Sequence, residues 1–123
     1  MAGQVDENAE FSLNKVIVIT GASRGIGAAT ARLAAVRGYA VCVNYRKDQA
    51  AANAVVVDIE SAGGQAIAVA ADVAVETEVV DLFRTVDRRL GTVTALVNNA
   101  GILEAQKRVA EMAAARLNRI LAT

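Results

Sequence analysis

The segment Thr20-Gly-Ala-Ser-Arg-Gly-Ile-Gly27 places three glycines between two different kinds of sequence. Before it, residues 15–20 form a nearly unbroken run of β-branched side chains, which predicts a strand buried on both faces of a parallel sheet. After it, residues 26–37 predict a helix that ends at Gly38. A strand, a glycine-rich turn and a helix in this order are the context of a loop that binds the pyrophosphate of a dinucleotide.

The spacing of these glycines, Gly-x-x-x-Gly-x-Gly, differs from the more widespread Gly-x-Gly-x-x-Gly pattern, but the same physical reasons apply. Gly21 lets the backbone turn sharply off the strand. Gly25 and Gly27 leave room for a pyrophosphate and let the helix pack closely on the sheet, while the helix N-terminus offers N–H groups to an anion. The alternative is a tight turn without a ligand, and the strand and helix on either side favour the binding role.

Strand and helix patterns alternate along the chain after an acidic segment at residues 1–14, which we expect to be a flexible tail. Apolar and helical patterns predict strands at 15–20, 40–44, 65–70 and 93–97 and helices at 26–37, 48–62, 76–90 and 108–121. One side of the first helix carries Ile26, Ala29, Thr30, Leu33, Ala34 and Arg37, and Val79, Val80, Phe83, Val86 and Leu90 recur at helical spacing in the third. The Ala-rich stretches are expected to be helix and strand faces whose small side chains allow close packing. The order predicts an α/β fold, a Rossmann-like doubly wound parallel sheet with strands in the spatial order 3-2-1-4.

The residue types that are missing exclude several kinds of site. The chain has no His and one Cys, which excludes a Ser-His-Asp triad, a thiolate zinc site and an internal disulfide, and we expect no metal. Its 13 basic residues balance 13 acidic ones, so no basic footprint indicates nucleic-acid binding. No apolar run approaches the ~20 residues of a membrane span, and residues 1–14 lack the basic start of a signal peptide. These features predict a soluble cytoplasmic domain.

Three segments that each follow a predicted strand resemble the hallmarks of one family. The glycine loop at 20–27 resembles the cofactor loop of the short-chain dehydrogenases/reductases, Asn98-Asn-Ala-Gly101 resembles their second hallmark, and Asp72-Val73 resembles their adenine-contact dipeptide. The resemblance covers about residues 13–123. It implies hydride transfer between a nicotinamide dinucleotide and the carbonyl or alcohol group of a small molecule, in an enzyme that assembles as a dimer or tetramer.

The resemblance also implies a set of cofactor-binding residues. These are Gly21, Ser23, Arg24, Gly25, Ile26, Gly27, Tyr45, Arg46, Asp72, Val73, Asn98, Ala100 and Gly101. Asp72 is expected to accept a hydrogen bond from the adenine amino group, and the backbone of Val73 to meet a ring nitrogen. Asp72 has an alternative role as the cap of the following helix, and a purely structural role for Asn98 is equally open.

The end of the second predicted strand bears on the choice of cofactor. An NAD-selecting site places Asp or Glu there to accept a hydrogen bond from the ribose 2′-hydroxyl, and this carboxylate repels a 2′-phosphate. The residues present, Asn44-Tyr45-Arg46, include no acid. Arg46 and Arg24 provide two guanidinium groups for a 2′-phosphate, which predicts NADP(H) in preference to NAD(H). The alternative is that Arg46 is a solvated residue before the next helix.

The catalytic residues implied by the family are not found in the sequence. The family's chemistry requires a Ser and a Tyr-x-x-x-Lys motif, but Val43 and Gln49 stand four residues after Tyr39 and Tyr45. No residue is therefore predicted to be catalytic. We expect residues 15–123 to be the N-terminal, adenosine-binding half of one Rossmann domain of about 250 residues, truncated before the fifth strand and inactive alone. The alternatives are a non-catalytic dinucleotide-binding module and a structural fragment that binds nothing.

Overall fold

A computed structural model of the chain describes residues 15–100 and Glu111. The elements are β1 (Val16–Ile19), α2 (Gly25–Val36), β2 (Ala40–Tyr45), α3 (Gln49–Ser61), β3 (Gln65–Ala70), α4 (Glu76–Arg89) and β4 (Ala95–Val97). No end of these elements differs from the sequence prediction by more than two residues. The expected tail at 1–14, the expected helix at 108–121 apart from Glu111, and the predicted ligand contact Gly101 lie outside the described residues.

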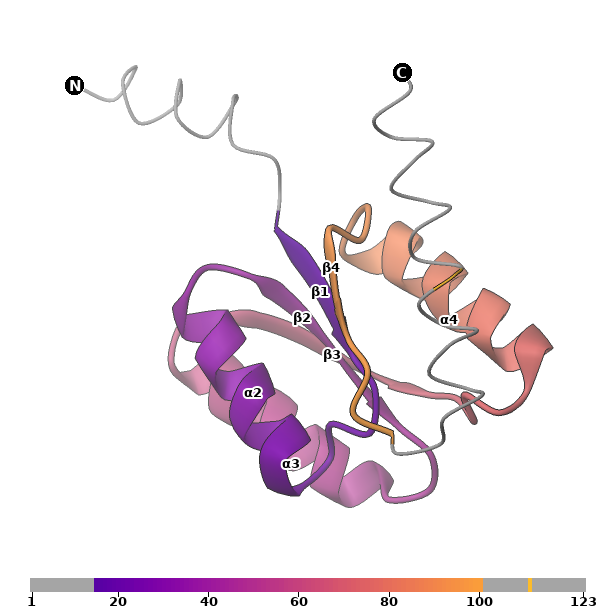
Figure 1. Cartoon of the computed structure of the whole chain (residues 1–123). Helices are drawn as coiled ribbons and strands as arrows, with labels where there is room; N and C mark the ends of the chain where they lie inside the picture. The colour runs from indigo at the N-terminus through magenta and orange to yellow at the C-terminus, as the bar shows by residue number, and fades with distance from the viewer. Residues whose placement is uncertain (1–14, 101–110, 112–123) are drawn as a thin grey trace, which may run out of the picture.

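The four strands form one parallel sheet in the order β3-β2-β1-β4, which confirms the predicted fold class and the predicted order 3-2-1-4. Ile19 near the end of β1 lies beside Val43 of β2 and Val97 of β4. Helices α2 and α3 cover one face of the sheet and α4 covers the other (Figure 1). Because all strands run in the same direction, the loops that follow them meet at one edge of the sheet.

The face under α4 is packed with large side chains. Val79, Phe83 and Val86 of the predicted stripe are buried there, against β1 and β2 residues that include Cys42. Burial raises the pKa of the Cys42 thiol to about 12, although the charge of Arg89 acts in the opposite direction. The thiol therefore stays protonated at neutral pH and packs as a small apolar side chain, as expected of a Cys in an apolar run.

The face under α2 is different, because the side of this helix that carries Ile26 and Leu33 is not the buried one. Ile26 is 80% exposed and Leu33 is 51% exposed, so these large side chains face away from the sheet. The buried positions of α2 are instead its smallest residues, Gly27, Ala28, Ala31 and Ala34. Small side chains let the helix axis come close to the sheet. The orientation of α2 therefore follows from this close packing, although the other side of the helix carries larger apolar residues.

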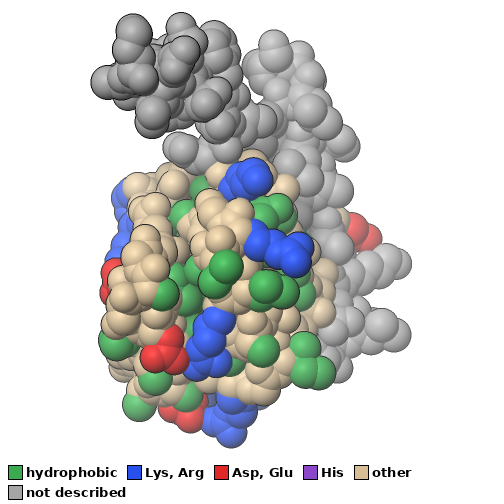
Figure 2. Space-filling model, turned by 90° about the vertical axis from the view of Figure 1, so that its left-hand side faces the viewer, with side chains coloured by type: hydrophobic (Ala, Val, Ile, Leu, Met, Phe, Trp, Pro, Cys, Tyr) green, Lys and Arg blue, Asp and Glu red, His purple; other side chains and the backbone are tan. Residues whose placement is uncertain are grey.

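The exposed apolar side chains on this side of the molecule are dispersed. Ile26, Leu33 and Val36 lie on α2, and Val57 lies on α3. Figure 2 shows the hydrophobic side chains of this face separated by basic and acidic ones. Scattered apolar residues of this kind are ordinary for a protein surface. Across residues 15–100 and Glu111, no helix is long and apolar enough to cross a bilayer.

Candidate dinucleotide-binding site

A small cavity opens at the carboxyl edge of the sheet, where the loops after all four strands meet. Its volume is about 150 Å³. The residues that line it are Gly21, Asn44, Arg46, Ala71, Asp72, Val73 and Ala100. Five of these seven were predicted as cofactor contacts from the sequence, and the structure brings them together from separate segments of the chain.

The glycine loop adopts a conformation that other residues resist. Gly21 and Gly25 have φ angles of +60° and +59°, in the left-handed region that L side chains rarely adopt. Gly27 is required for space instead, because a Cβ atom there would lie 2.5 Å from Asn99 Nδ2 and 2.6 Å from the Gly21 oxygen. The N-cap residue Arg24 makes no side-chain hydrogen bond to the first turn of α2. The Arg24 side chain therefore does not compete with an anion for the N–H groups of this first turn.

Two polar side chains join the end of β1 to the end of β4. The fully buried Thr20 hydroxyl accepts hydrogen bonds from the N–H groups of Asn99 at 2.9 Å and Ala100 at 3.2 Å. Asn99 Nδ2 donates to the carbonyl oxygen of Gly21 at 3.0 Å. Thr20 and Asn99 therefore tie the ends of β1 and β4 together, and this tie fixes one wall of the cavity.

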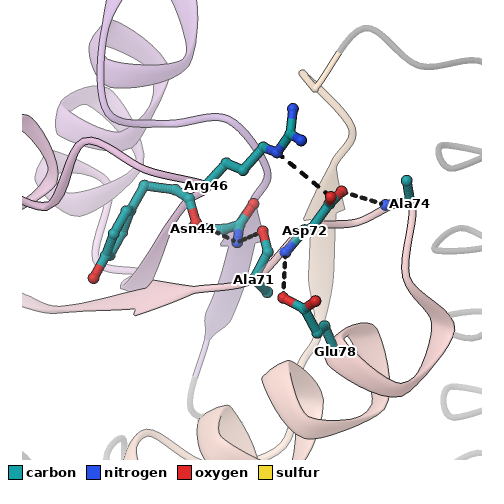
Figure 3. A network of polar contacts seen from close by, with 7 residues as sticks. Asn44, Arg46, Ala71, Asp72, Ala74 and Glu78 are labelled. Carbon is teal, nitrogen blue, oxygen red and sulfur yellow. Dashed lines mark hydrogen bonds and ion pairs between the residues drawn. The ribbon is translucent and has the colours of Figure 1, made fainter.

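Asn44 is a site residue that the sequence reasoning missed. It is 2% exposed near the end of β2, and its Oδ1 accepts a hydrogen bond from the Gly21 N–H at 3.2 Å. Its Nδ2 donates to the carbonyl oxygens of Val69 and Ala71, each at 3.2 Å. One amide thus holds the glycine loop and the end of β3 in place, as Figure 3 shows for Ala71. The signal in the sequence was a buried polar residue inside an otherwise apolar strand, because such a group must find partners.

Asp72 organises the turn between β3 and α4. Its Oδ1 accepts a hydrogen bond from the Ala74 N–H at 2.9 Å, and its own N–H donates to Glu78 Oε1 at 2.9 Å (Figure 3). The alternative that Asp72 caps the following helix is wrong, because the N-cap of α4 is Val75. The side chain stabilises a turn that precedes the helix, a common role of Asp, and this turn holds the carboxylate at the cavity.

Both arginines predicted to bind a 2′-phosphate form ion pairs with carboxylates. Arg24 Nη2 lies 2.7 Å from Asp48 Oδ2, and Arg46 Nε lies 3.4 Å from Asp72 Oδ2. The guanidinium of Arg46 therefore reaches across the cavity mouth toward Asp72 (Figure 3). The alternative view of Arg46 as a merely solvated residue misses this contact, although its side chain is 63% exposed.

Among the other predicted residues that the structure describes, none lines the cavity. Ser23 and Asn98 are half-buried, and Gly25 and Ile26 are exposed at the start of α2. The Tyr45 side chain is buried in the apolar cluster beneath α2 and α3, so a ligand would meet the backbone of this residue. Within the part of the chain that the structure describes, no group of three or more acidic, Cys or His side chains is arranged to hold a metal ion.

Comparison with known proteins gives a consistent set of relatives. Residues 15–123 match the family model for short chain dehydrogenases. The uncharacterised oxidoreductase YgfF of Escherichia coli is 46% identical over 108 residues, which are 88% of this chain and 44% of that protein. A crystal structure of a short chain dehydrogenase from Mycobacterium avium superposes with a TM-score of 0.80 at 30% identity, covering 88% of this chain and 49% of that one.

A third relative is short. The short-chain dehydrogenase/reductase homolog YusS of Bacillus subtilis is 44% identical over 90 residues, which are 73% of this chain and 83% of that protein. The chain thus spans less than half of YgfF and of the M. avium enzyme but most of YusS. The family model covers almost the whole chain, and the fold and the loops at the strand ends agree with it. The chain belongs to the short-chain dehydrogenase family.

Proposed function

We propose that the chain binds NADP(H) in preference to NAD(H), as the dinucleotide-binding half of an oxidoreductase that transfers hydride between this cofactor and a small-molecule carbonyl or alcohol. The observation that carries the proposal is the composition of the cavity beside the end of β2. Arg46 lines it directly after Tyr45, the position near which an NAD-selecting site has a carboxylate, and Arg24 stands in the glycine loop.

Charge explains why these residues favour a 2′-phosphate. A carboxylate after the second strand accepts a hydrogen bond from the ribose 2′-hydroxyl and repels a phosphate at the same position. A guanidinium instead binds phosphate through charge-assisted hydrogen bonds. Arg24, Arg46 and Lys47 bring three positive charges to the loops around this end of β2, against the two negative charges of Asp48 and Asp72.

Different loops are proposed to bind different groups of the cofactor. The glycine loop and the start of α2 are proposed to hold the pyrophosphate, and Asp72 to accept a hydrogen bond from the adenine amino group. When bound, the nicotinamide supplies the hydride. The sequence contains no Tyr-x-x-x-Lys, so we propose that the reacting groups belong to the portion of the longer relatives that this chain does not match. Assembly as a dimer or tetramer and a cytoplasmic location stay predictions from the sequence.

The proposal is tested by measuring dissociation constants for NADPH and NADH through nucleotide fluorescence. We expect NADPH to bind at least about tenfold more tightly, the equivalent of one good charge-assisted contact. Arg46→Gln should remove most of this difference. Arg32→Gln is the matched control, because Arg32 also pairs with a carboxylate, Asp58 at 2.9 Å, but does not line the cavity. Tighter binding of NADH by the unaltered protein would contradict the proposed preference.

A second candidate function is a dinucleotide-binding module without chemistry. The observation that favours it is YusS, a relative of which this chain covers 83%. The two functions differ in turnover and not in binding. An oxidoreductase that includes its catalytic residues oxidises NADPH in the presence of a suitable aldehyde or ketone. A binding module binds NADPH but reduces none of a broad panel of carbonyl compounds.

A further inference from the structure

Asp48 places a negative charge against one of the two proposed 2′-phosphate ligands. It is the N-cap of α3, where its Oδ1 accepts a hydrogen bond from the Ala51 N–H at 2.9 Å. Its other oxygen, Oδ2, lies 2.7 Å from Arg24 Nη2. The Asp48 carboxylate is therefore paired with the Arg24 guanidinium, which the proposed function expects to bind the 2′-phosphate.

The cap fixes this carboxylate more firmly than an ordinary surface ion pair would. The hydrogen bond to Ala51 holds one oxygen, and the positive end of the α3 dipole attracts the negative charge of the carboxylate. The Asp48 side chain is 41% exposed, whereas that of Arg24 is 75% exposed. The carboxylate is thus held by the backbone of α3 as well as by Arg24, so we expect Asp48 to decide where the more exposed guanidinium of Arg24 lies.

The second arginine is occupied differently. Arg46 meets Asp72 through Nε, at the longer distance of 3.4 Å, so its two terminal nitrogens are not used in this pair. Arg24 meets Asp48 through a terminal nitrogen at 2.7 Å. An incoming phosphate can therefore engage both terminal nitrogens of Arg46 together, whereas at Arg24 one of the two terminal nitrogens is already bound by Asp48.

We propose that Asp48 is a positioning residue that sets cofactor specificity: it competes with the 2′-phosphate for Arg24 and so limits the preference for NADP(H). This inference rests on the proposed function. While Arg24 is paired with Asp48, its positive charge is partly neutralised and is less available to a 2′-phosphate, whereas the uncharged 2′-hydroxyl of NAD(H) depends little on this guanidinium. Removing the charge of Asp48 therefore strengthens the binding of NADP(H) relative to NAD(H).

The decisive variant is Asp48→Asn in the full chain, because Asn caps helices as well as Asp and the start of α3 is preserved. The measured quantity is the ratio of the dissociation constants of NADH and NADPH, at low and at moderate salt. We expect this ratio to rise about three- to tenfold in low salt and less in higher salt. Asp58→Asn is the matched control, since Asp58 pairs with Arg32 on the outer surface and should leave the ratio unchanged.

The same substitution in a protein without Arg24 tests whether competition for Arg24 causes the change in the ratio. In an Arg24→Gln protein, the added Asp48→Asn change should alter the ratio by less than about twofold, because the contested guanidinium is gone. An unchanged or falling ratio in Asp48→Asn overturns the inference, as does a full-sized rise without Arg24. The proposed function is judged separately, on the ratio of the unaltered protein, and a protein that binds neither nucleotide overturns both.

Discussion

Helices α4 and α2 pack on opposite faces of the sheet through side chains of different size. Under α4 the core is built from large side chains, with Leu82 and Phe83 almost completely buried. Under α2 the helix contributes Gly27, Ala28, Ala31 and Ala34. Large side chains bury more apolar area and add more to stability, whereas small ones let a helix approach the strands closely. The α4 face is therefore suited to stabilise the sheet and the α2 face to position the loop that begins α2.

The close approach on the α2 face reaches directly into the candidate site. A Cβ atom on Gly27 would lie 2.6 Å from the Gly21 oxygen, so the first turn of α2 rests against the glycine loop itself. The same loop is held from the other side by Asn44 and Asn99. Helix α4 meets the site at its margin, where the Glu78 carboxylate accepts a hydrogen bond from the N–H of the turn before the helix. The packing of α2 is thus part of the geometry of the site, whereas α4 supports one turn beside it.

The largest expected effect comes from the face with large side chains. Phe83→Ala should lower the free energy of unfolding by about 3–5 kcal/mol, because it removes a fully buried ring and leaves a cavity. Urea denaturation monitored by circular dichroism measures the change. Phe83→Leu is the graded control and should cost less. A loss below about 1 kcal/mol for Phe83→Ala would show that this face does not carry the stability assigned to it.

Helix α2 should instead be destabilised when a side chain on its buried side is enlarged. Ala31→Leu should destabilise the protein by about 1–3 kcal/mol, because Ala31 is completely buried and added methyl groups force α2 away from the sheet. Ala29→Leu, on the exposed side of the same helix, is the matched control with an expected change below about 0.5 kcal/mol. Ala31→Leu should also weaken NADPH binding. Equal stability of the two variants would refute close packing of α2.

The same contrast explains how much of the fold could be predicted. The strands, the helices and their order followed from apolar runs, helix periodicity and the right-handed rule for parallel crossovers. The buried side of α4 was also correct, since its apolar residues recur at helical spacing and its remaining positions are polar. Close packing of α2 was expected from its Ala-rich composition, but its buried side did not follow from periodicity, because Ala and Gly carry little hydrophobic signal while the exposed Ile26 and Leu33 carry much. Periodicity detects large buried residues and misses a helix that packs through its smallest ones.

The residues of the candidate site were predicted better than their hydrogen-bond and ion-pair partners. Gly21, Arg46, Asp72, Val73 and Ala100 were named from short segments at strand ends, and they line one cavity. Asn44 was missed, because its role depends on backbone groups of two other segments that are remote in sequence. The pairing of Arg24 with Asp48 was missed for the same reason, since their separation of 24 residues gives no local pattern. Residue types at strand ends can be read from a sequence, but the partners that hold them cannot.

The smallest expected effect tests the exposed side of α2. Leu33→Gln should change the free energy of unfolding by less than about 0.5 kcal/mol, because Leu33 is 51% exposed and the two residues have similar helix propensities. Leu82→Gln is the matched comparison on α4, where the same substitution places an amide in the core and should cost several times more. Urea denaturation of both variants gives the difference directly. A loss of stability at Leu33 comparable to that at Leu82 would mean that α2 buries its large apolar side chains in a core. The side of the helix with Ile26 and Leu33 would then face the sheet, and the close packing of Gly27 and Ala31 would be wrong.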